Sequence, residues 1–300
     1  MTSLRSLRLA ALALFLPLVL APAAAQDAPA LQAQHANLQQ ALAHSPFQRP
    51  LVLQANASAE APHGNVYAIL NHPFATVGSA FQKPAHWCDV LMLQFNVKRC
   101  EVSGRNASTQ LQVAIGKKVE QPLSDAIKVA FDYRVRAAEG DYLSVQIHAP
   151  EGPLGTHDYL LRLDAVPLDA QRSFLHMSYS YANGLAARLA TSAYLATSGR
   201  SKVGFTVVRR DPSGQPIYVG GVQGVAERNA MRYFLAIEAF LEAQSAPPAE
   251  RAERRLRGWF TATERFPRQL HEMEMGDYLA AKRRQLRLTG SSTASAEPAH

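Results

Sequence analysis

The feature that most constrains the fold is a long stretch of alternating hydrophobic residues between positions 90 and 181. In six successive segments, apolar and polar side chains alternate with a period of two residues, and turn sequences such as Glu139-Gly140 separate them. A period of two puts every second side chain on the same face of a strand. Six such strands in succession predict an antiparallel, strongly curved meander with one face covered. The segments are Leu91–Val97, Leu111–Ile115, Val129–Val135, Leu143–Ile147, Tyr159–Leu163 and Leu175–Tyr181.

One long amphipathic helix is predicted after the meander, from Gly220 to Gln244. Apolar side chains recur at helical spacing along one face, and Pro247-Pro248 ends the pattern. Asn229 interrupts the apolar face. Because a buried amide without partners costs about 1–3 kcal/mol, Asn229 is either a core residue bonded to a neighbouring strand or a polar group that faces a cavity.

Shorter elements surround these two features. Residues 26–48 predict either a mobile N-terminal lead or a docked helix, and residues 51–70 predict two strand-like pieces. Further predictions are a helix after Pro73, a helix from Gly184 to Ser198, a hairpin across residues 203–219, a helix from Ala249 to Phe266, and a disordered polar tail over residues 289–300.

The N-terminus predicts export. Arg5 and Arg8 precede an apolar run that ends at Leu20, and Ala23-Ala24-Ala25 offers a small-residue cleavage site. This is the pattern of a secretory signal peptide over residues 1–25. An uncleaved anchor is the alternative, and the periplasm is the expected location.

The two cysteines predict a disulfide bond. Cys88 and Cys100 are the only cysteines, and both lie in the exported part of the chain. An oxidising compartment favours their pairing. A catalytic thiol is the alternative, but the neighbours of both cysteines include no general base.

The formal net charge is +7, and Arg5 and Arg8 of the predicted signal peptide supply two of these units. The mature chain would therefore still be basic. Export argues against a nucleic-acid partner, so anionic lipid headgroups or simple solubility remain as explanations. The aromatic and basic stretch from Arg251 to Phe266 either packs on the domain or makes transient contact with an anionic membrane surface.

The order of these elements resembles the helix-grip fold of the START (StAR-related lipid-transfer) superfamily over about residues 51–244. The segment GNVYAILNHPFATVGSAFQKPAHWCDV is similar to the first strand and paired short helices of that superfamily. The resemblance implies an α+β fold in which the curved sheet grips the long helix. The expected domains are a START-like domain over residues 49–246 and a C-terminal helical extension over residues 247–288.

The resemblance also implies a cavity for a hydrophobic small molecule or lipid. Arg228 and Arg232 are expected on a solvated helix face, with the cavity mouth as the functional alternative. The residues expected to face inward, each either ordinary core or a ligand contact, are Tyr133, Val145, Leu161, Met177, Tyr179, Asn229 and Tyr233.

The sequence contains no G-x-S-x-G, G-x-x-x-x-G-K-[ST] or H-E-x-x-H motif and none of the known metal-ligand spacings. His148, His157 and His176 could converge on a metal only if their strands are neighbours, and two of them lie on the outward phase, so no metal and no cofactor is expected. Non-catalytic binding or transport of a lipid is the favoured function. The alternatives are an enzyme using the same cavity, with Asp132, His148, His157 or Asn229 in acid–base roles, and an envelope structural or adaptor protein.

Overall fold

The computed structural model describes residues 27–197 and 199–294. The predicted signal peptide therefore lies outside the described residues. Among the helices of the described part, none combines the length and the apolar character needed to cross a bilayer.

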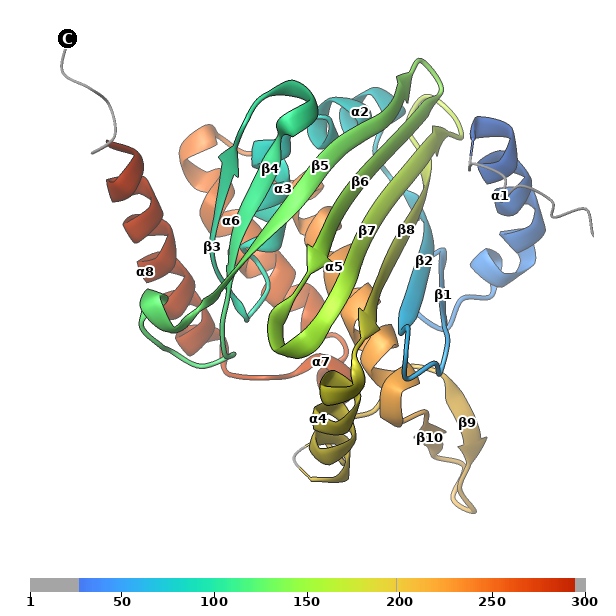
Figure 1. Ribbon diagram of the computed structural model, residues 1–300. Helices are drawn as coiled ribbons and strands as arrows, with labels where there is room; N and C mark the ends of the chain where they lie inside the picture. The colour runs from blue at the N-terminus through green and yellow to red at the C-terminus, as the bar shows by residue number, and fades with distance from the viewer. Residues whose placement is uncertain (1–26, 198, 295–300) are drawn as a thin grey trace, which may run out of the picture.

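An eight-stranded antiparallel sheet forms the centre of the molecule (Figure 1). The strand order is β1-β2-β8-β7-β6-β5-β4-β3, so the strands from β3 to β8 form the predicted meander and the first hairpin adds to its end. A separate hairpin consists of β9 and β10. The strands are β1 (Leu51–Ala55), β2 (His63–Leu70), β3 (Val97–Ser103), β4 (Gln110–Ile115), β5 (Ile127–Glu139), β6 (Tyr142–Glu151), β7 (Thr156–Pro167), β8 (Ser173–Asn183), β9 (Val207–Arg210) and β10 (Pro216–Tyr218).

The helices cover both faces of this sheet. Prolines open several of them, because proline fits the first helical turn, where no backbone donor is needed: Pro84, Pro248 and Pro267 each occupy such a position. The helices are α1 (Ala28–Ala43), α2 (Phe74–Phe81), α3 (Pro84–Leu91), α4 (Leu185–Ala196), α5 (Gly221–Ala243), α6 (Pro248–Thr263), α7 (Pro267–Leu270) and α8 (Met275–Ala294).

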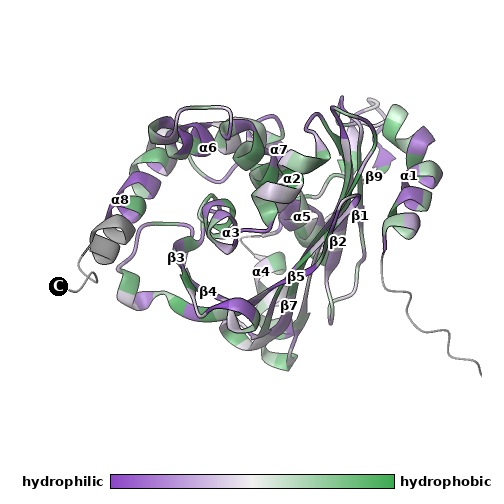
Figure 2. Cartoon of the chain, turned by 90° about the horizontal axis from the view of Figure 1, so that it is seen from above, coloured by the Kyte–Doolittle hydropathy of each residue, from purple (hydrophilic) through white to green (hydrophobic). Residues whose placement is uncertain are grey.

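Seen from above, the sheet bends around α3 and α5 (Figure 2). Helices α6 and α8 form a further layer behind them, and α1 lies against the opposite, convex face of the sheet. Docking of α1 resolves the alternative left open for residues 26–48, because Leu31 and Leu42 pack against Tyr67 and Phe174 of the sheet. The curved antiparallel sheet and the gripped long helix confirm the α+β helix-grip fold.

The long helix α5 lies directly on strand β2. Gly64 allows this approach, because a Cβ atom at that position would lie 2.8 Å from the Ala230 Cβ and 3.0 Å from the Ala226 carbonyl oxygen. Small residues on both elements therefore set the distance between helix and sheet.

Three sequence predictions are wrong. The predicted disordered tail does not begin at residue 289, because α8 continues to Ala294. The segment Leu91–Val97 is not a strand, since α3 continues to Leu91 and β3 begins at Val97. Nearly every side chain of this segment is buried. In a segment that is buried on all sides, the spacing of apolar residues alone cannot distinguish a strand from another structure. Helix α5 also lacks a solvated polar face: α6 packs along it, and Glu227, Arg228 and Arg232 are all buried.

The C-terminal extension packs into the same core as the sheet. Leu256, Trp259 and Phe260 of α6 are buried, and the Trp259 indole donates to the Arg232 carbonyl oxygen at 3.1 Å. Helix α8 contributes buried Tyr278, whose hydroxyl donates to the Leu93 carbonyl oxygen at 3.0 Å.

The predicted disulfide is confirmed. Cys88 of α3 and Cys100 of β3 are bonded, with their Cα atoms 5.2 Å apart. The bond joins a short helix to the edge strand of the sheet and closes a loop with a sequence separation of 12 residues.

The double substitution Cys88→Ser and Cys100→Ser should lower the free energy of unfolding by about 3 kcal/mol, because the unfolded chain regains the freedom that this loop removes. Urea denaturation followed by the fluorescence of the buried Trp87 and Trp259 measures the change. Wild-type protein in reductant is the matched control and should lose a similar amount; equal stability of all three samples would contradict the expectation.

Candidate ligand-binding site

A small cavity remains between the sheet and α5. Its volume is about 90 Å³, well below the roughly 300–1,000 Å³ of ordinary small-molecule pockets. In this conformation it has room for a small polar group, not for a lipid chain. The lining residues are Gln94, Phe95, Asn96, Lys118, Tyr179, Asn229, Arg232 and Tyr233.

Aromatic side chains form one wall of the cavity and continue beyond it. The rings of Tyr179 and Tyr233 are 4.8 Å apart, and Tyr159 stacks on Tyr181 at 5.2 Å. Burial raises the pKa of all four tyrosines, so their hydroxyls are neutral at physiological pH. This wall offers apolar ring surface with a few uncharged hydrogen-bonding groups.

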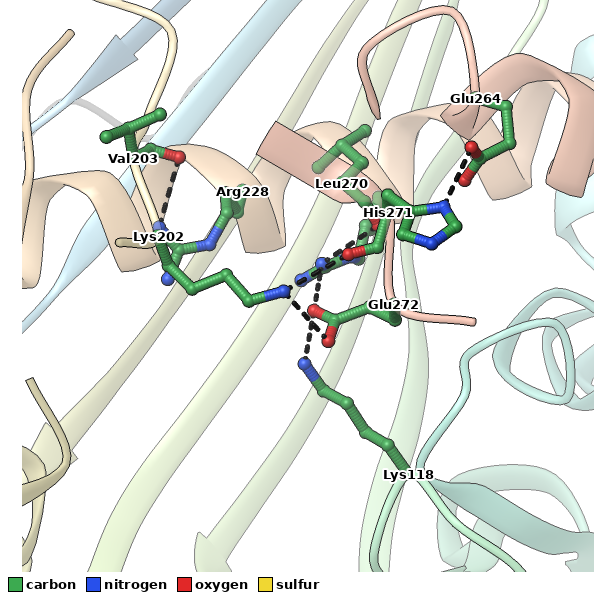
Figure 3. Close-up of polar contacts among 9 residues, drawn as sticks. Lys118, Lys202, Val203, Arg228, Glu264, Leu270, His271 and Glu272 are labelled. Atoms are coloured by element: carbon green, nitrogen blue, oxygen red, sulfur yellow. Dashed lines mark hydrogen bonds and ion pairs between the residues drawn. The ribbon is translucent and has the colours of Figure 1, made fainter. Parts of the chain in front are cut away.

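Cationic side chains gather at the other end of the cavity, around the single carboxylate of Glu272 (Figure 3). Its Oε1 atom lies 2.5 Å from both the Arg232 guanidinium and the Lys118 ammonium, and its Oε2 atom lies 3.3 Å from Lys202 Nζ. Arg228, one helical turn before Arg232, donates to the Val203 carbonyl oxygen at 3.1 Å. We call Lys118, Lys202, Arg228, Arg232 and Glu272 the cationic cluster.

The charges of the cationic cluster do not balance. Burial would raise the pKa of Glu272, but Arg232 and Lys118 bring it below its ordinary value, so the carboxylate is ionised. Burial and the nearby Arg232 lower the pKa of Lys118 to about 8, although Glu272 opposes this. Three cations contact one carboxylate, so the cluster has the chemistry of an anion-binding site.

Helix α4 lies beside the outer end of the cationic cluster. Burial lowers the pKa of Arg228 and Arg232, and the Tyr194 hydroxyl of α4 is one of the nearby groups that oppose this shift. Only Ala187 of α4 is buried. The helix is therefore held by few core contacts.

The structure brings some of the sequence-predicted residues together and separates others. Tyr179, Asn229 and Tyr233 line the cavity, together with Arg232. Four others belong to the packed core: Tyr133, Val145, Leu161 and Met177. The hydroxyl of Tyr133 donates to the Phe81 carbonyl oxygen at 2.9 Å, so this buried polar group has a partner within the protein and needs no ligand.

The expectation that Arg228 and Arg232 lie on a solvated helix face is wrong. Their exposed fractions are only 4% and 6%, because α6, α7 and the segment after α4 enclose this part of α5. A buried guanidinium needs acceptors, and Arg232 finds them in Glu272 and in the Leu270 carbonyl oxygen.

Of the residues considered for acid–base roles, Asn229 lines the cavity, whereas Asp132, His148 and His157 lie outside it. The exposed Asp158 carboxylate is 2.8 Å from His157 Nδ1 and 3.8 Å from His148 Nε2. Asp132 accepts a hydrogen bond from the Gln110 amide. Within the described ranges, no group of three or more histidine, cysteine or acidic side chains is placed to hold a metal ion.

Sequence reasoning named Arg228 and Arg232 as candidates for the cavity mouth but missed Lys118, Lys202 and Glu272 of the cationic cluster, and it missed two surface grooves. Glu272 and Lys118 are remote from α5 in the chain, so no local pattern marks them. The grooves have volumes of about 680 and 560 Å³ and share Phe47, Arg265 and Phe266. Both lie where the segment before β1 meets the α6–α7 turn; the end of β2 and α5 complete the first groove, and the β9–β10 hairpin completes the second. No sequence signal could predict this meeting of distant segments.

No family model matches the chain, and no curated protein matches it either. Solved structures with a similar arrangement of elements include norcoclaurine synthase from Thalictrum flavum, at 17% identity over 50% of this chain and 87% of the other, with a TM-score of 0.33. A START superfamily protein from Mycobacterium smegmatis is 14% identical over 45% of this chain and 78% of the other, with a TM-score of 0.30. A protein from Thermus thermophilus is 13% identical over 62% of this chain and 100% of the other, with a TM-score of 0.40. These proteins are similar to this chain in fold alone.

The substitution Glu272→Gln should destabilise the protein by about 3 kcal/mol, because it leaves the buried Arg232 without its counter-charge. Thermal and urea unfolding measure the effect. Glu250→Gln is the matched control, since it removes an exposed i,i+4 pair with Arg254 and should change stability by less than about 0.5 kcal/mol. Equal effects of the two substitutions would show that the cationic cluster does not depend on Glu272.

Proposed function

We propose that the protein is a periplasmic binding or transport protein for a lipid or other hydrophobic small molecule that carries an acidic group. The observation that supports this most directly is the composition of the cavity wall: Lys118 and Arg232 line the same space as Tyr179 and Tyr233. Cations that outnumber their carboxylate suit an acidic head group, and the aromatic rings suit an apolar body.

The size of the cavity sets a condition on this function. About 90 Å³ accommodates a head group but not an acyl chain, so the ligand-bound form must be wider. Helix α4 is the element best suited to move, because it lies beside Arg228 and buries only Ala187. Segments with few buried contacts open at low free-energy cost.

The substitution Lys118→Met should weaken the binding of oleate by about tenfold or more, because it removes a charge-assisted contact with the carboxylate. Displacement of a fluorescent fatty acid, checked by native mass spectrometry, measures the affinity. Lys117→Met, at the exposed neighbouring position, is the matched control and should bind as the wild type does. Oleyl alcohol should bind both proteins equally, because it has no charge to lose. If wild-type protein binds neither compound, the proposed function fails.

The pH dependence of oleate binding should report on the same lysine. With a pKa of about 8 in the free protein, Lys118 is mostly protonated at pH 7 and mostly neutral at pH 9, whereas a carboxylate stays ionised throughout. Affinity should therefore fall as the pH rises through 8. The groups that face Lys118 are Glu272, Arg232 and Lys202, and none has an ordinary pKa between 7 and 9. If the affinity of Lys118→Met for oleate does not vary with pH, the pH dependence of the wild type is due to Lys118. If the variant shows the same pH dependence as the wild type, Lys118 is not its cause.

An enzyme acting on a hydrophobic substrate in the same cavity is the second candidate, and Lys118 favours it. A lysine with a pKa of about 8 is partly unprotonated near neutral pH, so its amine could act as a base or a nucleophile. Incubation with a lipid extract from cell envelopes separates the two functions. Recovery of unchanged ligand supports binding, and a change in ligand mass that Lys118→Met abolishes supports catalysis.

A further inference from the structure

Helix α4 exposes its apolar side. Leu185 and Leu189 are four residues apart, hence on the same helix face, and their exposed fractions are 66% and 65%. A helix on the surface of a soluble domain normally turns such a face toward the core. Leu154 of the adjoining β6–β7 connection, where Gly155 accepts a hydrogen bond from Gly184, is 77% exposed and extends the apolar surface.

The β9–β10 hairpin adds a second exposed apolar site at the same end of the molecule. Figure 1 shows α4 and the hairpin projecting together beyond the end of the sheet. Val207 and Val208 of β9 are both exposed. We use the name projecting end for helix α4, the adjoining residues Pro153–Gly155 and the β9–β10 hairpin.

The projecting end carries more basic than acidic side chains. Residues 184–219 contain five arginines or lysines and a single acidic residue, Asp211. Two of the five form ion pairs with carboxylates outside the projecting end, Arg188 with Glu60 and Lys202 with Glu272, so the excess positive charge comes from Arg200, Arg209 and Arg210. The Asp211 carboxylate accepts hydrogen bonds from Ser213 and from the Gln215 amide of the hairpin turn, so it is occupied locally. Arg200 and Arg209 are exposed, at positions that flank the apolar residues in the chain.

Exposed leucines and valines beside cations match the surface of an anionic bilayer, where side chains enter the headgroup region and arginines meet phosphates. We propose that the projecting end binds an anionic lipid surface. A patch for a protein partner would not require this one-sided charge. Such binding does not depend on whether the cavity holds a ligand, but it would bring α4, the element beside the cationic cluster, into contact with lipid.

The C-terminal extension fits a lipid surface less well. Its large apolar side chains, Leu256, Trp259 and Phe260, are buried in the core. Several of its arginines form ion pairs within the protein, including Arg254 with Glu250, Arg255 with Asp89, Arg257 with Glu253, Arg283 with Glu253, and Arg284 with Glu120. The membrane contact expected from the sequence at residues 251–266 is therefore better supported at the projecting end.

The test is co-sedimentation of the mature chain with vesicles of phosphatidylcholine containing about one-third phosphatidylglycerol. Leu185→Gln with Leu189→Gln should weaken binding at least about tenfold, because leucine gains free energy on transfer from water into the bilayer and glutamine does not. Glutamine keeps the helix propensity of leucine, so circular dichroism should show unchanged folding. Arg200→Gln with Arg209→Gln should weaken binding about fivefold per arginine at low salt.

Two control variants and one control vesicle make the outcome decisive. Val102→Gln with Ile127→Gln removes two exposed apolar side chains of the sheet and should bind as the wild type does, as should Arg283→Gln with Arg284→Gln. Vesicles of phosphatidylcholine alone should bind weakly. Several results would overturn the assignment: no binding of the wild type, equal binding of the leucine variant, a loss of binding only in the Arg283 and Arg284 variant, or a wild-type dimer that the leucine variant converts to monomer.

Discussion

The burial of charged residues on α5 is the constraint on which the rest of the structure depends. A charge taken out of water must find a partner or destabilise the fold. Each buried charge of α5 is paired by a segment outside the sheet. Glu227 accepts from the backbone of Phe205 and Thr206, Arg228 donates to Val203, Arg232 pairs with Glu272, and Glu238 pairs with Arg49. The segment before β1, the segment between α4 and β9, and the C-terminal extension therefore all bind to α5 through these pairs.

These attachments explain why the extension contributes to the candidate site. If the face of α5 that points away from the sheet met water, its charges would need no partners. Here α6 covers that face, so Arg232 turns its guanidinium toward the end of the cavity, where Glu272 follows α7. The counter-charge of the cavity wall therefore comes from the C-terminal extension and not from the sheet.

The sequence allowed prediction of what is encoded locally. Helix α5 lies within one residue of its predicted bounds, and five of the six meander strands follow from a period of two. The strand prediction for Leu91–Val97 failed because its apolar and polar residues are buried alike, so their alternation does not mark a buried and an exposed face. The position of Arg232 could not be predicted either, because its exposure depends on α6 and its partner Glu272 is 40 residues away. Long-range pairings of this kind leave no periodic signal.

The excess of cations around Glu272 is not explained by folding alone. One arginine would satisfy the carboxylate, and each further cation adds repulsion, which together with burial lowers the pKa of Lys118. The desolvation affects the ammonium group beside Glu272, whereas 44% of the Lys118 side chain as a whole is exposed, so its removal would leave no hole in the packing. A cation in excess of the local carboxylate, placed on the wall of a cavity, is the pattern expected when the compensating negative charge comes from outside the protein. An acidic ligand would supply that charge.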